Sequence, residues 1–412
     1  MGSTDSRQYE IPSNDDGVAS LEELTSEGTG SGLESEHISN DGDISAPFDP
    51  KLIDVITQQR TVDLLMARLT HGELDLSPDF QRRANLWNEA QKSALIESML
   101  LRIPIPSLYV SENDDGNYQV VDGLQRFCAI AHFVCFSALN KALKINNPAL
   151  NPLRLQGLQS LKSELENKSF DELPRPLQRR IKETELTLHV IRAGTPFNVK
   201  FNIFSRINQG GLPLNAQEIR NAIYPGKWRE HIRRMAESPI FLLSTERKIK
   251  GERLEDHELV LRFAALYSQS DNQRRHPDEN LDTFLNEFVE KRAAGWNDHK
   301  WSEVEEAFNR AMEIAPRVFG KIAFRKYSPP NSARRPINRG LFETEAVALA
   351  KRTNDKIDIL VKKSELVIQK LGEKFDSNTD FKNALLYATG KGWASNKRLE
   401  VMNDIFDEVL HA

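Results

Sequence analysis

Residues 118–134 read YQVVDGLQRFCAIAHFV and carry the clearest structural signal in the chain. Residues 118–121 have the composition of a strand, and Asp122-Gly123 supplies a tight turn. From Leu124 onwards, apolar residues recur at helical spacing. The stretch therefore predicts a strand that passes through a glycine turn directly into a buried helix.

The flanking sequence predicts an α+β core around this unit. Residues 108–111 form a candidate strand, which Asp115-Gly116 connects to the strand at 118–121 as a hairpin. Residues 186–190 alternate apolar and polar side chains, which indicates a further strand. An apolar face over residues 61–69 predicts a helix at the start of the core. Capping-box patterns open two more helices, at Asn88 with Gln91 and at Asn215 with Glu218.

Composition divides the chain into three parts. Residues 1–50 hold twelve acidic side chains and one arginine, a net charge of −11, whereas the remainder carries +6. Because so polar a segment cannot bury enough apolar surface to offset the entropy of ordering it, we predict a disordered acidic leader over residues 1–49. We predict that residues 50–224 form the α+β core, with an insertion of short helices at about 137–182. Helical periodicity predicts an all-helical carboxy-terminal domain over 225–412.

The sequence also indicates where in the cell the protein resides. The chain contains no apolar run of about 18 residues, and its first thirty residues lack an apolar core segment. These features exclude a helical membrane span and a secretory signal, so we expect a cytoplasmic protein without a membrane partner. Two cysteines are too few for a disulfide framework or a zinc cage.

The turn Asp122-Gly123-Leu124-Gln125-Arg126 is the first candidate site. A glycine between a strand and a helix lets backbone approach a ligand, and the free N–H groups of the first helical turn suit a phosphate. Arg126 would add a charge-assisted hydrogen bond. Asp122 would repel the phosphate, so its carboxylate must cap the helix, hold an arginine or bind a phosphate-bound Mg²⁺. An ordinary Asp-Gly turn with a solvated arginine is the alternative interpretation.

Two other segments place polar side chains beside predicted turns. In the first, Phe80-Gln81-Arg82-Arg83 precedes Trp87, and packing of the two aromatic rings would direct one guanidinium inward. In the second, a glycine pair ends one helix and a capping box opens the next, which explains the connection without a ligand. The polar and glycine residues crowded at this second junction are Arg206, Asn208, Gly210, Gly211, Arg220 and Asn221.

Four basic clusters offer a different anion-binding surface. Each is typical of a solvated helix face, but together they would suit a phosphate backbone. The acidic leader would then compete with nucleic acid for that surface, whereas its simpler role is solubility. The clusters are Arg175/Arg179/Arg180/Lys182, Arg229/Arg233/Arg234, Arg247/Lys248/Lys250/Arg253 and Arg334/Arg335/Arg339.

The order of the three polar segments, with Ile103-Pro104-Ile105-Pro106 between the first two, resembles the amino-terminal domain of the GmrSD modification-dependent restriction enzymes. The likeness covers about residues 50–225 and is weaker around 337–349. The family's Asp-Gly-Gln-Gln-Arg signature falls on residues 122–126, where Leu124 replaces a glutamine and removes one polar side chain. The resemblance implies a ParB/sulfiredoxin-like mixed core.

The resemblance also implies a nucleoside-triphosphate site with Mg²⁺ in a phage-defence or DNA-processing protein. The catalytic residues would be Asp122, which is also the candidate Mg²⁺ ligand, with Gln125 and Arg126. The nucleotide-binding residues would be Gln81, Arg82, Gly123, Arg206, Asn208, Gly210 and Gly211.

We therefore expect a nucleoside triphosphatase whose bound state controls a response directed at DNA or at a partner protein. The alternative is a non-hydrolytic, ParB-like DNA-binding or adaptor module that recruits a separate nuclease or effector protein. In GmrSD proteins, cutting belongs to a His-Asn-His region, which needs histidine and metal ligands. Because the histidines after residue 225 are scattered singly, we expect no nuclease activity in this chain.

Overall fold

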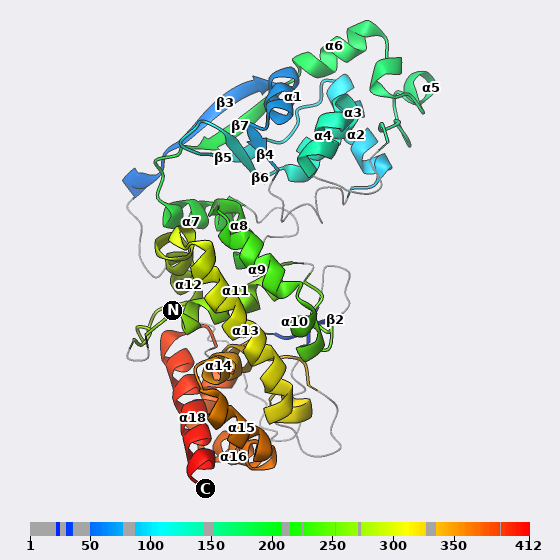
Figure 1. The fold of residues 1–412 in the computed structure, drawn as a ribbon. Coiled ribbons are helices and arrows are strands. Elements are labelled where there is room, and N and C mark those ends of the chain that lie inside the picture. The colour runs from blue at the N-terminus through cyan, green and yellow to red at the C-terminus, as the bar shows by residue number, and fades with distance from the viewer. Residues whose placement is uncertain are drawn as a thin grey trace, which may run out of the picture.

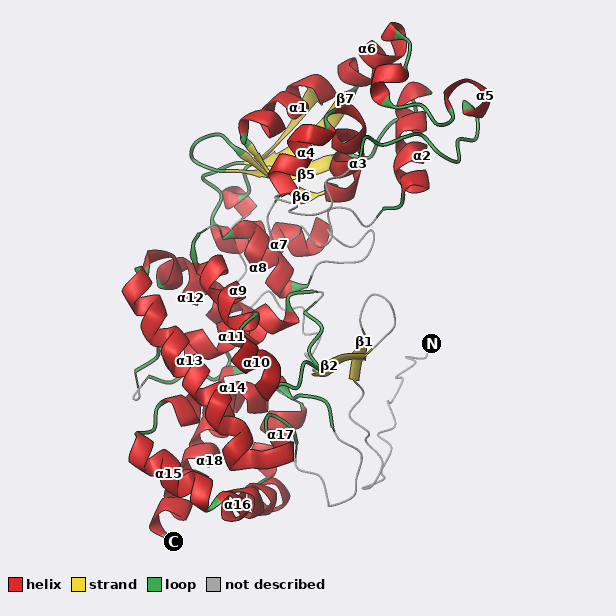
Figure 2. Cartoon of the chain, turned by 45° about the vertical axis from the view of Figure 1, so that its right-hand side comes forward, coloured by secondary structure: helices red, strands yellow, loops and turns green. Residues whose placement is uncertain are grey.

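A mixed sheet with its helices forms one end of the molecule, and a helical region forms the rest (Figure 1). Figure 2 shows the strands confined to that end, apart from the short hairpin of β1 (Glu22–Leu24) and β2 (Gly30–Glu34). This arrangement confirms the predicted α+β class. The computed structural model describes residues 22–24, 30–35, 50–76, 87–143, 151–207, 215–224, 226–251, 253–270, 273–326, 335–387 and 389–412.

The sheet has five strands in the order β3-β7-β5-β6-β4. They are β3 (Val55–Thr61), β4 (Leu74–Asp75), β5 (Leu108–Glu112), β6 (Tyr118–Asp122) and β7 (Glu185–Ile191). β7 pairs antiparallel with β3 and parallel with β5, while β6 pairs antiparallel with β5 and parallel with β4. The predicted hairpin is present, with Gly116 at φ 76° in its turn.

Six helices belong to this end of the molecule, and local sequence accounts for where two of them start. Asn88 and Gln91 form the predicted capping box, and Thr61 caps the first helix through its hydroxyl. Short helices occupy much of the predicted insertion. The helices are α1 (Val62–His71), α2 (Glu89–Leu100), α3 (Leu124–Val134), α4 (Phe136–Leu143), α5 (Lys162–Leu165) and α6 (Arg175–Glu183), with 3-10 turns at Pro50–Leu52 and Phe170–Glu172.

The remaining helices follow β7 without a further strand in the described residues, as the periodicity predicts. The capping box of Asn215 with Glu218 opens α8 as expected. None of the described helices is long and apolar enough to cross a lipid bilayer. The helices are α7 (Phe197–Ile207), α8 (Ala216–Ile223), α9 (Trp228–Ala236), α10 (Pro239–Ser244), α11 (Glu255–Tyr267), α12 (Leu281–Lys291), α13 (Asp298–Phe319), α14 (Arg339–Ala350), α15 (Asn354–Lys362), α16 (Ser364–Ser377), α17 (Thr379–Leu386) and α18 (Gly392–His411), with 3-10 turns at Ala293–Gly295 and Gly320–Ile322.

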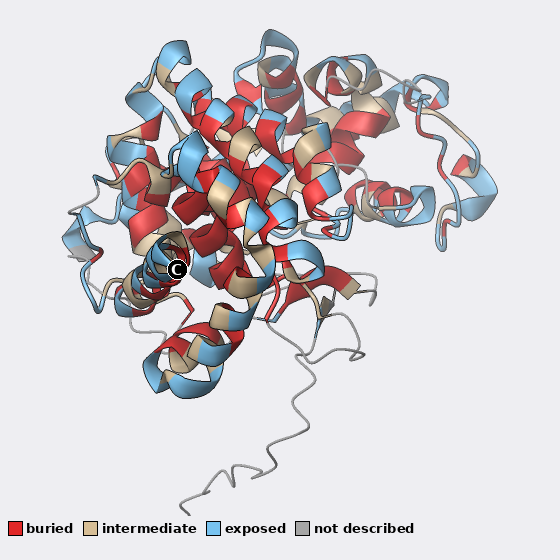
Figure 3. Cartoon of the chain, turned by 60° about the horizontal axis from the view of Figure 1, so that its bottom comes forward, coloured by how far each residue is buried: buried red, intermediate tan, exposed pale blue. Residues whose placement is uncertain are grey.

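Neighbouring residues at the ends of β6 and β7 belong to different hydrophobic clusters. Val120 and Val190 belong to the cluster shared with α1 to α4, whereas Val121 and Ile191 belong to the cluster of the helical region. This division follows from the alternation of side chains along a strand. Figure 3 shows buried residues continuing through the helical region. The ends of β6 and β7 therefore join the two parts of the molecule.

Part of the predicted leader is ordered, and the prediction of disorder over residues 1–49 is wrong for β1 and β2. The side chain of Leu33 is fully buried in the helical cluster. Glu34 donates its N–H to the carbonyl of Ile337 at 2.8 Å, and Ile337 donates to Gly32 at 3.0 Å. A composition average over fifty residues conceals this short segment, whose single leucine and backbone hydrogen bonds provide the stabilisation.

The helical region buries charged side chains around α14, all of whose residues are buried. Arg398 contacts Glu343 at 2.5 Å, and Arg262 lies 3.7 Å from the same carboxylate. Burial raises the pKa of Glu345 well above its ordinary value, opposed by the N–H of Phe324 and by a neighbouring arginine. Buried charges are stable only when paired, so these contacts fix the packing of the helices around α14.

Candidate functional site

Gly123 forms the turn between β6 and α3. It has φ 88°, a left-handed conformation that favours glycine. A Cβ at this position would lie 2.2 Å from Cδ2 of Leu108 on β5. Glycine therefore lets α3 start directly against the neighbouring strand, which is the strand–turn–helix unit predicted from the sequence.

Arg126 ties this turn to the loop before β5. Its Nη2 donates to Oδ2 of Asp122 at 2.8 Å, and its Nη1 donates to the carbonyls of Pro106 and Ser107 at 2.7 and 2.8 Å. Of the three roles considered for Asp122, the structure shows that it holds an arginine. The side chains of Arg126 and Asp122 retain 17% and 33% of their exposure, so the pair borders solvent.

Gln125 connects α3 to the segment that leads into α2. Its side-chain oxygen accepts from the backbone N–H of Trp87 at 3.4 Å. Trp87 therefore lies beside the first turn of α3. Gln81 and Arg82, for which the family resemblance implies nucleotide binding, lie outside the described residues.

The third polar segment divides into an exposed part and a buried part. Arg206 is exposed on the last turn of α7, and within the described part of the chain no hydrogen bond or ion pair joins it to the β6–α3 junction. Arg220 instead points into the helical region, where it contacts Asp282 and Asn286 at 2.8 Å. The crowding of polar side chains after α7 is therefore in part structural. Asn208, Gly210 and Gly211 lie outside the described residues.

All three segments fall within the residues that match one family model. Residues 65–225 match the family model described as the GmrSD restriction endonuclease N-terminal domain. This part of the chain is therefore similar to the N-terminal domain of GmrSD restriction endonucleases. The match begins within α1, ends just beyond α8 and covers less than half of the chain. No curated protein matches the chain.

The amino end of α3 carries a set of backbone donors. Gly123 occupies the cap position, and within the described residues no side chain caps the helix. The first N–H groups of a helix lack intrahelical acceptors and carry partial positive charge. The junction therefore offers donors to an anion, with the Arg126 guanidinium close by.

Asp122 is the residue that the sequence assigns to Mg²⁺. Its Oδ2 faces Arg126, while its Oδ1 makes no hydrogen bond or ion pair within the described part of the chain. Among those residues, no group of three His, Cys, Asp or Glu side chains is placed to hold a metal ion. One carboxylate oxygen suits Mg²⁺ when phosphate oxygens and waters complete the shell, so the junction fits a phosphate-bound ion.

Behind the junction, α3 buries ionisable groups against α2. Nζ of Lys92 lies 3.3 Å from Nδ1 of His132, and burial lowers the pKa of both. Burial also raises the pKa of the Cys128 thiol to about 12, although Lys92 opposes this shift. The thiol is therefore protonated at neutral pH and is no nucleophile. These groups hold α2 to α3 rather than extend the site.

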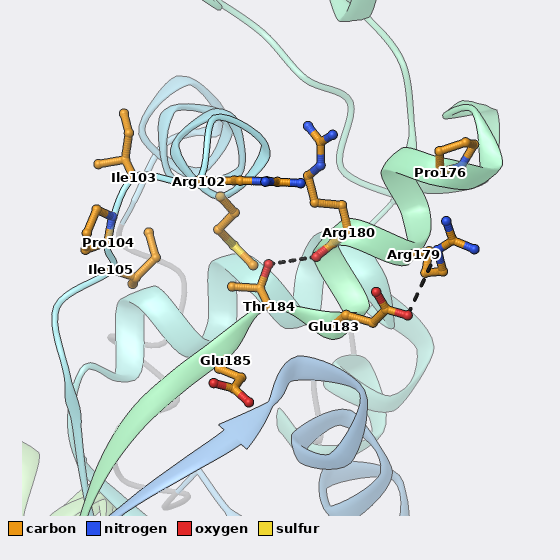
Figure 4. Close-up of a pocket in the computed structure, with 11 residues that line it drawn as sticks. Arg102, Ile103, Pro104, Ile105, Pro176, Arg179, Arg180, Glu183, Thr184 and Glu185 are labelled. Atoms are coloured by element: carbon orange, nitrogen blue, oxygen red, sulfur yellow. Dashed lines mark hydrogen bonds and ion pairs between the residues drawn. The ribbon is translucent and has the colours of Figure 1, made fainter.

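A cavity of about 450 Å³ lies along the same loop that receives Arg126 (Figure 4). Arg102 follows α2 with φ 61°, and Arg179 and Arg180 come from α6. Arg180 donates to the carbonyl of Leu100 at 3.0 Å, and Arg179 lies 4.0 Å from Glu183. Because an arginine near the carboxy end of a helix stabilises the terminal carbonyls, Arg180 has a structural role at the end of α2. The sequence analysis missed the grouping with Arg102, which no local pattern signals.

Proposed function

We propose that this chain is a nucleoside-triphosphate-binding protein and nucleoside triphosphatase of a phage-defence restriction system. The observation that carries the proposal is the uncapped amino end of α3 beside the left-handed Gly123. Triphosphates are held by such helix ends in unrelated folds. The description of the matching family, a restriction endonuclease domain, supports the biological setting.

In this proposal, backbone groups at the junction bind the phosphates and side chains position them. Gly123 and the first turn of α3 would receive the phosphates. Arg126 would act chiefly as a positioning residue, because its guanidinium holds Asp122 and two carbonyls while its charge remains beside the phosphates. Gln125 would connect the ligand to the segment that begins before Trp87.

Asp122 would contribute to hydrolysis in either of two ways. Its Oδ1 would hold Mg²⁺ on the phosphates or orient water, while its Oδ2 stays bound to Arg126. Mg²⁺, when bound, would neutralise developing phosphate charge. Both uses require the ion pair with Arg126 to keep the carboxylate in place.

The test is nucleotide binding and phosphate release by the wild type, Asp122→Ala and Arg126→Ala. We expect Arg126→Ala to weaken nucleotide binding about tenfold to a hundredfold, because a hydrogen bond to a charged group contributes about 1.5–3 kcal/mol. Asp122→Ala should abolish phosphate release. Arg154→Ala is a matched control, because Arg154 also pairs with a carboxylate and a carbonyl, those of Glu172 and Asn167, outside the junction. Unchanged binding in both junction variants contradicts the proposal.

A second candidate function is a non-hydrolytic DNA-binding or adaptor module that recruits a separate effector. The observation that favours it is the engagement of Arg126 by protein acceptors, together with Leu124 at a position where the family carries glutamine. DNA binding that weakens with salt, needs no nucleotide and occurs without phosphate release would favour this function.

A further inference from the structure

Two basic clusters recognised in the sequence come together around the N-terminal hairpin. One cluster follows α10 and includes Arg247, Lys248 and Lys250, all exposed. The other precedes and begins α14, where Arg335 and Arg339 lie. β2 runs between them, because Lys250 donates to the carbonyl of Ser31 while Ile337 exchanges hydrogen bonds with Gly32 and Glu34. Arg339 is itself buried and donates to the carbonyl of Glu34. We therefore call the other four cations, Arg247, Lys248, Lys250 and Arg335, the basic surface.

β2 is a fixed anchor in this surface. Leu33 is fully buried, and Glu34 pairs with the buried Lys326 and accepts from Asn338 at 3.0 Å. A Cβ at Gly32 would lie 2.0 Å from the carbonyl of Lys248, so the strand lies directly against the loop after α10. Displacing this strand from the domain would expose Leu33 to water and would separate Lys326 from the Glu34 carboxylate. β2 therefore belongs to the folded domain.

β1 differs from β2 in its exposure and charge. Glu22 is exposed, and its Oε1 accepts the N–H of Gly32 at 2.6 Å. Glu23 pairs with Arg339 at 2.5 Å and keeps 41% of its exposure. β1 thus presents carboxylates at the edge of the basic surface.

We propose that the basic surface binds the phosphate backbone of nucleic acid and that the carboxylates of β1 compete with it. Because β2 is anchored, these carboxylates stay at high local concentration beside the basic surface. They therefore lower its affinity for nucleic acid while the hairpin remains attached to the domain. The inference locates the nucleic-acid contact that the second candidate function needs. It is independent of nucleotide binding at α3.

The distribution of charge favours a polyanion over a small ligand. The exposed cations follow one another along a loop instead of converging on one point, as a ligand with repeated phosphates requires. Nearby carboxylates are engaged: Glu246 faces Arg325 at 3.4 Å, and Glu255 accepts from the N–H of Arg253. Engaged carboxylates oppose an incoming phosphate less than free ones do.

The test is binding of a labelled duplex DNA by full-length variants over a salt series, without nucleotide. Lys248→Gln with Lys250→Gln should weaken binding about tenfold and lower the slope of log affinity against log salt by about 1.8, about 0.9 for each lysine that no longer neutralises a phosphate. The matched control is Lys356→Gln with Lys362→Gln, which removes two exposed lysines from α15. This control should change binding far less.

The competing carboxylates are tested by Glu22→Gln with Glu23→Gln, which preserves their hydrogen-bonding oxygens. We expect DNA to bind about two- to tenfold more tightly at low salt, and we expect no gain in the Lys248→Gln/Lys250→Gln background. Equal binding by the lysine variant and its α15 control overturns the proposed surface. A gain that persists without the two lysines overturns the competition.

Discussion

Arg126 and Arg398 make the same set of contacts in two different parts of the molecule. Each binds one carboxylate and two backbone carbonyls, those of Asp122, Pro106 and Ser107 for Arg126 and those of Glu343, Ala384 and Thr389 for Arg398. They differ in burial. Arg398 and Glu343 are 0% and 1% exposed, whereas Arg126 and Asp122 border solvent at 17% and 33%.

The difference shows that an arginine bound to one carboxylate and two carbonyls, here called an arginine clamp, does not by itself identify a functional site. Around α14 the clamp is enclosed by packed helices, and every terminal nitrogen of Arg398 has a protein partner. At the β6–α3 junction the same chemistry stands next to a helix end without a side-chain cap in the described residues. Exposure and free backbone donors distinguish a candidate site from a structural contact.

The largest expected effect comes from breaking the buried clamp. Arg398→Met leaves Glu343 buried without its closest partner, which should cost about 3–5 kcal/mol of unfolding free energy. Arg126→Met should cost less, about 1–3 kcal/mol, because water reaches its partners. Chemical denaturation measures both. Since an apolar pair can replace a buried ion pair, adding Glu343→Met to Arg398→Met should restore part of the loss. Equal losses at the two clamps would contradict the comparison.

Truncating the anchor of the N-terminal hairpin should have the next largest effect. Leu33→Ala removes a fully buried side chain and should cost about 2–5 kcal/mol. Leu243→Ala on α10 is the control, because 68% of that leucine is exposed and its loss should be nearly neutral. Thermal unfolding of the two variants gives the comparison. A neutral Leu33→Ala would show that residues 30–34 do not contribute to the folded domain.

A comparable effect is expected at the glycine of the candidate site. Gly123→Ala should cost about 1–2 kcal/mol for its positive φ and a further 1–3 kcal/mol, roughly, for the contact with Leu108. Gly116→Ala isolates the first contribution, because Gly116 also has positive φ but open space around it. Denaturation curves should therefore rank Gly123→Ala below Gly116→Ala in stability. The reverse order would mean that α3 does not start against β5.

The smallest effect is a pH dependence from Glu345. Because burial raises its folded pKa above the ordinary value, the folded state holds a proton that the unfolded state releases. The contribution to stability is present below the ordinary pKa and is lost as pH rises towards the folded value. The slope is at most about 1.4 kcal/mol per pH unit. Glu345→Gln should flatten the curve of unfolding free energy against pH, and parallel curves would contradict the shift.

Local patterns predicted the elements that carry the site. The Asp-Gly turns, the two capping boxes and the strand-to-helix unit depend on neighbouring residues, and the structure confirms each of them. The partners of Arg126 and Arg220 depend on long-range contacts, which spacing does not encode. The same limit explains the error at β2, since burial of Leu33 requires a groove built by residues more than two hundred positions away.

The most direct measurement is an experimental structure of the full chain with Mg²⁺ and a non-hydrolysable nucleoside triphosphate. We expect phosphate density within hydrogen-bonding distance of the first N–H groups of α3, with Arg126 still bound to Asp122. Density confined to the cavity of Arg102 and Arg180, or a complex that does not form at nucleotide concentrations in large excess over the protein, would contradict a triphosphate site at the β6–α3 junction.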